Sequence, residues 1–131
     1  MPVLEDLWVF TDHGTPVIDF SKKGSVDKSL LGCAISAIEL FSQKVSGKKI
    51  KAFNVGNNKF SCIPCLDEKI ILVIKSSSDT NDKTVRKIGK IISKIFEKMF
   101  TIGDIEKWNG DLSFFDEFKS KLDLYFRMGD L

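Results

Sequence analysis

The chain has 131 residues, of which 43% are hydrophobic and 29% charged, and both values are typical of one compact domain. A chain of this length buries roughly two thirds of the surface that its unfolded form exposes, so it needs no metal ion or disulfide to stabilise its core. Its formal net charge of +2 is too small for a protein whose main role is to coat nucleic acid. We therefore expect a single domain over residues 1–131 that binds no nucleic acid.

No stretch reaches the roughly 20 apolar residues of a membrane span. The first residues carry Glu5 and Asp6 where a secretory signal would carry positive charge. The three cysteines are an odd number, unlike the even framework of a small secreted scaffold. These features predict a cytoplasmic protein with reduced thiols, and they leave open a peripheral contact with an anionic membrane.

The first elements in chain order are two extended segments around a turn. Apolar residues 7–10 and the extended pattern of residues 16–20 flank Gly14, which predicts a β-hairpin. Residues 7–10 show no alternation of apolar and polar side chains, as is typical of a strand covered on both faces. Because proline cannot donate to a ladder, Pro16 places the second strand at a sheet edge or at its own beginning.

A long amphipathic helix follows. Apolar residues recur mostly at steps of three and four over residues 26–45, and Gly47 ends the pattern. Ser25 is the expected N-cap, because its hydroxyl can accept a bond from the free N–H groups of the first turn. We expect one face to pack on a sheet, and the small side chains of Ala34 and Ala37 to let the helix axis lie close to it.

Three further strands are predicted before the next helix. Residues 50–55 and 60–63 flank a turn of Gly and Asn residues, which supply the positive φ of a tight hairpin. Pro64 predicts a strand end or a bulge. Residues 70–74 form a continuous apolar and mostly β-branched run, which indicates a central strand with cover on both faces.

The remaining residues predict two helices. Apolar residues at helical spacing mark residues 85–100 and 115–126, and Gly103 interrupts the pattern between them. Ser113 and Asp116 resemble a capping box at the start of the last helix.

The element order is therefore β, β, α, β, β, β, α, α. Two strands covered on both faces require helices on both faces of the sheet. This predicts an α/β (α+β) three-layer sandwich around a five-stranded, mainly antiparallel sheet, with the first helix on one face and the last two sharing the other.

Residues with catalytic or metal-binding chemistry are few. His13 is the only histidine and lies in a predicted turn without a nucleophile nearby in sequence. Cys62 and Cys65 form a C-x-x-C, but zinc needs four ligands and no second pair is present. Redox motifs of this spacing open a helix, whereas this one ends a strand. The phosphate-binding pattern G-x-x-x-x-G-K-[ST] is absent. We expect no enzyme, no cofactor and no metal site.

Two basic surfaces are the candidate binding sites. The first is a predicted edge strand together with the adjacent helix of residues 26–45. The strand could accept a partner strand, and its lysines could guide an acidic partner; the strand residues are Lys49, Lys51, Phe53 and Val55. The second is a basic face of the second long helix, a solvated surface or a contact face for an anionic partner; its residues are Lys83, Lys87, Lys90, Lys94 and Lys98.

The chain resembles the longin domain, a family of non-catalytic modules in SNAREs, adaptor-complex small chains, transport-particle subunits and the signal-recognition-particle receptor. The resemblance covers most of the chain. Its parts are the hairpin LWVFTDHGTPVIDFS, the helix SLLGCAISAIELFSQKVSG, the hairpin IKAFNVGNNKFSC, the strand EKIILVIKSS, and a closing helix pair around WNGDLSFFDEF.

The resemblance implies a sheet in the order 2-1-5-4-3, which makes residues 7–10 and 70–74 adjacent and central. It also implies a free-standing adaptor or regulatory subunit for small GTPases in vesicle-trafficking-type machinery. The partners would be a small GTPase, a SNARE-like segment or another longin- or roadblock-type chain, in a homo- or hetero-dimer. Two other functions stay open, a profilin-like actin-binding protein and a small thiol redox protein that uses Cys62 and Cys65.

Overall fold

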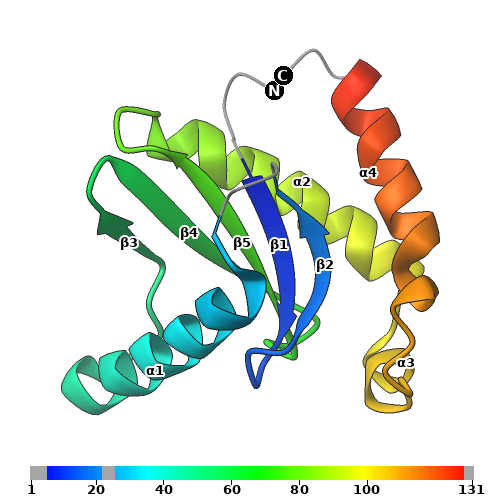
Figure 1. Cartoon of the computed structure of the whole chain (residues 1–131), viewed down its shortest axis with the longest axis horizontal. Coiled ribbons are helices and arrows are strands. Elements are labelled where there is room, and N and C mark those ends of the chain that lie inside the picture. The colour runs from blue at the N-terminus through cyan, green and yellow to red at the C-terminus, as the bar shows by residue number, and fades with distance from the viewer. Residues whose placement is uncertain (1–5, 22–25, 129–131) are drawn as a thin grey trace.

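The computed structural model describes residues 6–21 and 26–128 of the chain, and the layout of its elements is shown in Figure 1. The strands are β1 (Asp6–Thr11), β2 (Pro16–Phe20), β3 (Ala52–Val55), β4 (Asn58–Cys65) and β5 (Ile70–Ser77). The helices are α1 (Lys28–Ser46), α2 (Asp82–Met99), α3 (Ile102–Glu106), the 3-10 turn η1 (Leu112–Phe115) and α4 (Asp116–Met128).

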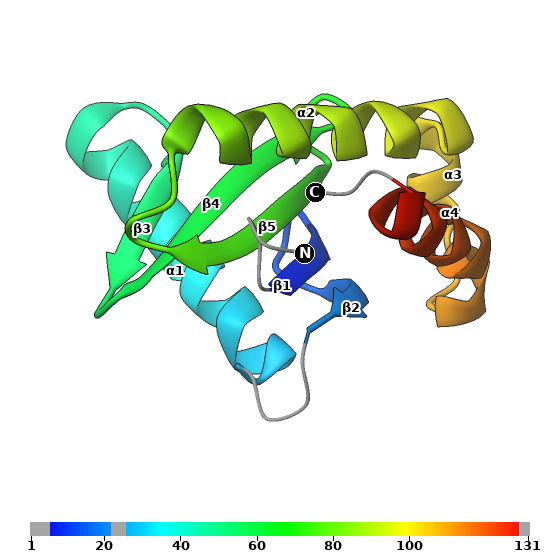
Figure 2. The ribbon, with the colours of Figure 1, turned by 90° about the horizontal axis from the view of Figure 1, so that it is seen from above.

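The five strands form one sheet in the order β2-β1-β5-β4-β3, and every neighbouring pair is antiparallel. This confirms the predicted order. Figures 1 and 2 show α1 and α2 on opposite faces of the sheet. The central strand β5 alternates accordingly, because Ile71 and Val73 pack on the α1 side whereas Leu72 and Ile74 pack on the α2 side.

The α2 side holds the larger core. The apolar stripe of α2 and the inner face of α4 cover β1, β2 and β5 together, as predicted for the last two helices. Phenylalanines join the two helices, since the rings of Phe96 and Phe118 meet edge to face with centroids 5.0 Å apart.

On the α1 side, a glycine brings the helix close to the first hairpin. A side chain at Gly32 would collide with the backbone oxygen of Gly14, so only glycine allows the helix to pack this close to the β1–β2 turn. Ala34 and Ala37, which we expected to give this close approach, are instead exposed to solvent. The difference is one of helix phase, because Gly32 shares the buried side with Leu31 and Ile35.

The helix ends differ from the prediction in two places. Asp27 caps α1 by accepting the Leu30 N–H, and the expected cap Ser25 lies outside the described residues. At the other end, Gly47 stops the helix in the left-handed conformation, as predicted. Ser113 is not a helix cap, since its N–H and hydroxyl both donate to the carboxylate of Asp111.

Strand β3 begins at Ala52 and not at residue 50, so Lys49 and Lys51 precede the strand instead of belonging to it. One further backbone bond continues the β3–β4 pairing beyond the start of β3, since the Cys62 N–H donates to the Lys51 carbonyl. Pro64 lies inside β4, one residue before its end. Alternation along β4 turns the Pro64 nitrogen outward like that of Cys62, so the missing N–H removes no bond to β5.

Candidate functional site

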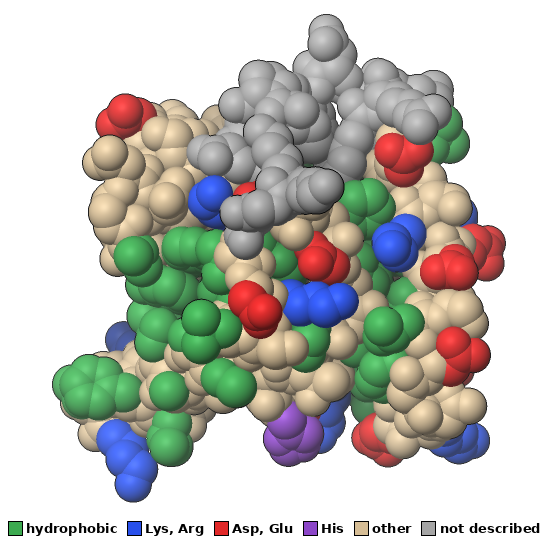
Figure 3. All heavy atoms as spheres, viewed as in Figure 1, with side chains coloured by type: hydrophobic (Ala, Val, Ile, Leu, Met, Phe, Trp, Pro, Cys, Tyr) green, Lys and Arg blue, Asp and Glu red, His purple; other side chains and the backbone are tan. Residues whose placement is uncertain are grey.

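Helix α1 carries two apolar stripes, and only one of them is buried. Leu31 and Ile35 pack against the sheet. The second stripe faces solvent, with Leu30, Phe41 and Val45 exposed by 68%, 70% and 69%. The expectation that the apolar residues of this helix form a single packed face is therefore wrong for half of them. Figure 3 shows hydrophobic side chains gathered over α1 and the strands beside it.

The C-terminal end of α1 lies on the same side of the molecule as strand β3, at the open edge of the sheet (Figure 1). Strand β3 is the last strand of the order, and its Phe53 ring stacks on Phe60 with centroids 5.1 Å apart. Because Lys51 bonds inward to β4, alternation turns the backbone groups of Ala52 and Asn54 outward, away from β4. We call this region the α1–β3 surface, and it comprises Leu30, Leu40, Phe41, Val45, Phe53 and Val55.

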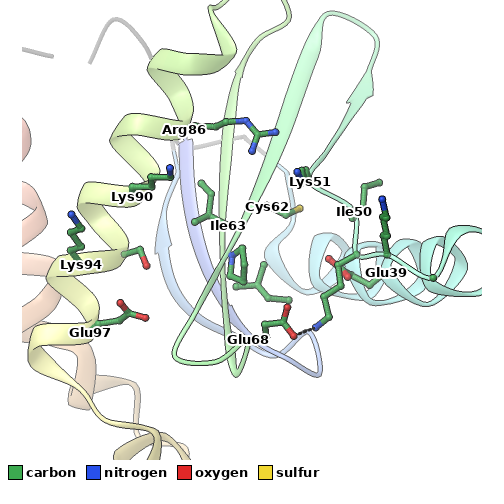
Figure 4. Close-up of a pocket in the computed structure, with 16 residues that line it drawn as sticks. Glu39, Ile50, Lys51, Cys62, Ile63, Glu68, Arg86, Lys90, Lys94 and Glu97 are labelled. Carbon is green, nitrogen blue, oxygen red and sulfur yellow. Dashed lines mark ion pairs between the residues drawn. The ribbon is translucent and has the colours of Figure 1, made fainter.

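A pocket of about 810 Å³ lies at the same edge of the sheet and is lined from both faces, by Glu39 of α1 and Ile71 on one side and by Ile63 and α2 on the other. Its floor is the apolar outer part of β4, including Ile63 and Pro64. One wall is the approach to β3, with Lys49 and Lys51, and the other wall is α2. Figure 4 shows Arg86 reaching from α2 over β4 toward the side on which Lys51 lies. We call this cavity the basic pocket.

The acidic groups of the pocket gather at one end. Lys49 pairs with Glu68 at 3.2 Å, the dashed contact in Figure 4. Burial raises the pKa of Glu39, an effect that Lys49 opposes and Glu68 reinforces. The carboxylate of Glu97 accepts the N–H of Leu66 at 2.9 Å. Glu68 and Glu97 therefore already have a cation or a donor from this protein, whereas the Oε2 atom of Glu39 is buried without a hydrogen-bond partner among the residues that the structure describes.

The basic groups are less compensated. In the described part of the chain, no acidic side chain forms an ion pair with the pocket residues Lys51, Arg86, Lys90 and Lys94. Positive charge therefore converges on the apolar floor from both walls.

The pocket joins parts of the two surfaces that the sequence suggested separately. Lys49 and Lys51 line it together with Lys90 and Lys94. Phe53 and Val55 belong to the α1–β3 surface, and Lys83, Lys87 and Lys98 are exposed on α2 but do not line the pocket. Sequence reasoning missed Arg86, although it lies four residues before Lys90 in the same helical row. It also missed Phe41 as an exposed residue.

Cys62 and Cys65 are free thiols on opposite faces of β4. Residues three apart in a strand point to opposite sides, so these two thiols do not face each other. Burial raises the pKa of Cys62 to about 12 and that of Cys65 to about 11. Both sulfurs are therefore protonated near neutral pH, the opposite of an activated thiol.

The remaining features are the histidine, the possible metal ligands and the length of the helices. His13 is exposed in the β1–β2 turn, with its Nε2 atom 3.5 Å from the carboxylate of Asp12. Within residues 6–21 and 26–128, no three His, Cys, Asp or Glu side chains are grouped to hold a metal ion. None of the described helices is both long and apolar enough to cross a membrane.

Comparison with known proteins identifies the fold. No protein-family model and no curated protein sequence matches the chain. Among solved structures, MglB of Myxococcus xanthus is similar with a TM-score of 0.53 and 11% identity, over 72% of this chain and 85% of MglB. The gliding protein MglB of Thermus thermophilus has a TM-score of 0.54 and 11% identity, over 68% and 73% of the two chains. The chain has a longin-like fold. At these identities the likeness extends to the fold alone.

Proposed function

We propose that this protein is a non-catalytic interaction subunit that regulates a small GTPase and binds its protein partners through the α1–β3 surface. The observation that carries the proposal is the exposed apolar stripe of α1, a helix whose C-terminal end lies on the same side of the molecule as an open strand edge. The longin-like fold supports it, since the resemblance of the sequence to longin domains implies adaptor and GTPase-regulatory roles. The raised pKa values of the two buried thiols argue against the redox alternative.

The exposed apolar side chains of the α1–β3 surface are unfavourable in water. Covering apolar surface gains about 25 cal/mol per Å², and exposed patches of this kind commonly mark interaction sites. The outward backbone groups of Ala52 and Asn54 can bond to a partner strand at the same time. A second longin- or roadblock-type chain fits this surface best, because it can offer an equivalent helix and strand edge in a symmetric dimer.

The test compares two substitutions of exposed apolar residues on different helices. Phe41→Asp places a charge in the middle of the α1–β3 surface, whereas Leu124→Asp places the same charge on α4, where Leu124 is also exposed. Light scattering after size-exclusion chromatography measures self-association, and capture by purified small GTPases and longin-type chains measures partner binding.

We expect Phe41→Asp to weaken association at least tenfold, because a charge replaces an aromatic anchor. Leu124→Asp should behave like the unsubstituted protein, and both variants should unfold at nearly the same temperature. Equal effects of the two substitutions would contradict the proposed surface. Capture of actin in place of a GTPase or a longin-type chain would favour the profilin-like alternative.

A further inference from the structure

We propose that the basic pocket is a second binding site, which holds an extended acidic segment of another protein. The segment would carry acidic residues at alternate positions with apolar residues between them. The inference goes beyond the proposed function, because the pocket and the exposed stripe of α1 are different surfaces that can be disrupted separately.

The first argument is charge. Lys51 on one wall and Arg86, Lys90 and Lys94 on the other line the same pocket without an ion-pair partner in the described part of the chain. The lining carboxylates of Glu68 and Glu97 are engaged by Lys49 and by the Leu66 N–H. An anionic occupant would therefore meet cations whose charge this protein leaves uncompensated.

The second argument is spacing. Arg86, Lys90 and Lys94 follow one another at steps of four along α2, which places their attachment points about 6 Å apart along the helix axis. Alternate side chains of an extended peptide are about 6.6 Å apart and point the same way. A row of acidic residues in an extended segment therefore matches this row of cations, whereas a single compact anion would reach only part of it.

The third argument is the floor. Ile63 lines the pocket on the face of β4 that the α2 cations share, and Pro64 and Ile71 continue the apolar lining around the strand edge from the other face. The side chains between the acidic residues would therefore meet an apolar surface. The outward Pro64 nitrogen has no hydrogen to donate, so recognition would depend on side chains more than on a continued ladder.

The same lining disfavours nucleic acid. None of the residues lining the pocket is aromatic, whereas proteins that hold single strands usually stack bases on aromatic rings. The three glutamates in the lining would also repel a continuous row of phosphates. A peptide with spaced acidic residues can avoid them.

The experiment uses a short fluorescent peptide with Glu at alternate positions and Val or Leu between them, and measures its anisotropy as protein is added. A second peptide of the same composition has all its Glu residues together. The pocket variant combines Arg86→Gln, Lys90→Gln and Lys94→Gln. The matched control combines Lys83→Gln, Lys87→Gln and Lys98→Gln, which removes three charges from the same helix outside the pocket.

We expect the alternating peptide to bind in a saturable way and more tightly than the clustered one. The pocket variant should weaken that binding roughly tenfold or more, and the control less than about twofold, since three ion pairs are lost only in the first. Thermal unfolding of both variants shows that the fold is kept. Equal losses in the two variants would overturn the proposal, as would failure of the full protein to bind the peptide. Tighter binding of a single-stranded oligonucleotide or of anionic vesicles, lost in the pocket variant, would also overturn it.

Discussion

At the scale of single residues, the three cysteines have different surroundings. Cys33 is exposed on α1, whereas Cys62 and Cys65 are buried on the α1 and α2 sides of the sheet. With pKa values of about 12 and about 11, the two buried sulfurs have little thiolate near neutral pH. Their chemistry is that of small apolar core residues.

Thiol labelling tests this difference. At pH 8 the thiolate fractions at Cys62 and Cys65 would be about one in ten thousand and one in a thousand. A Cys33→Ser variant should therefore react slowly with a thiol reagent until denaturant is added, and faster only as the pH rises toward 11. A Cys62→Ser variant should keep the fast reaction of Cys33. Rapid labelling of folded Cys33→Ser would contradict the raised pKa values and favour the redox alternative.

At the scale of elements, two glycines set how closely each helix lies on the sheet. Gly32 of α1 faces the backbone of Gly14, and Gly89 of α2 faces the side-chain ends of Ile63 and Ile74. A backbone atom cannot rotate away, whereas the end of an isoleucine side chain can. The same substitution should therefore have different costs at the two positions.

Replacing glycine by alanine inside a helix ordinarily stabilises it by up to about 1 kcal/mol. We expect Gly32→Ala to lower the free energy of unfolding by about 1–3 kcal/mol instead, because the new methyl group forces α1 away from the first hairpin. Gly89→Ala should cost less, since Ile63 can change rotamer. Urea denaturation of both variants measures the difference. An increase in stability for Gly32→Ala would mean that α1 does not pack on Gly14.

The elements also show what sequence patterns can predict here. Apolar side chains on both faces predict a central position for residues 7–10 and 70–74, and the neighbouring strands β1 and β5 lie inside the sheet as predicted. The buried face of α1 is not predictable in the same way, because its buried and its exposed apolar residues both recur at helical spacing. Periodicity alone does not tell which of the two stripes packs on the sheet. The sequence pattern predicts Ser25 as the cap, although Asp27 is of an equally favoured residue type. The structure selects Asp27 by its bond to Leu30.

At the scale of the whole molecule, the fold brings together charges that are far apart in the sequence. The basic residues before β3 and those of α2 meet across the outer part of β4. The sequence placed Lys49 and Lys51 on one surface and Lys90 and Lys94 on another. It gave no sign of the pocket, because that cavity depends on β3 starting late and leaving part of β4 uncovered.

The arrangement of layers predicts that the two proposed surfaces act independently. Phe41 is exposed on α1, whereas Arg86, Lys90 and Lys94 lie on α2, on the opposite face of the sheet. Substitutions without shared partners usually add in free energy. Phe41→Asp should therefore leave the affinity for the alternating acidic peptide unchanged within about twofold.

The variant with Arg86→Gln, Lys90→Gln and Lys94→Gln should likewise leave partner capture through the α1–β3 surface unchanged. A protein that carries these three substitutions and Phe41→Asp should lose peptide affinity and partner capture by the same factors as the separate variants. Peptide anisotropy and partner capture on the same four proteins measure this, with the unsubstituted chain as the reference. Loss of partner capture in the glutamine variant alone would instead indicate one continuous interface that wraps around the edge of β3 and β4.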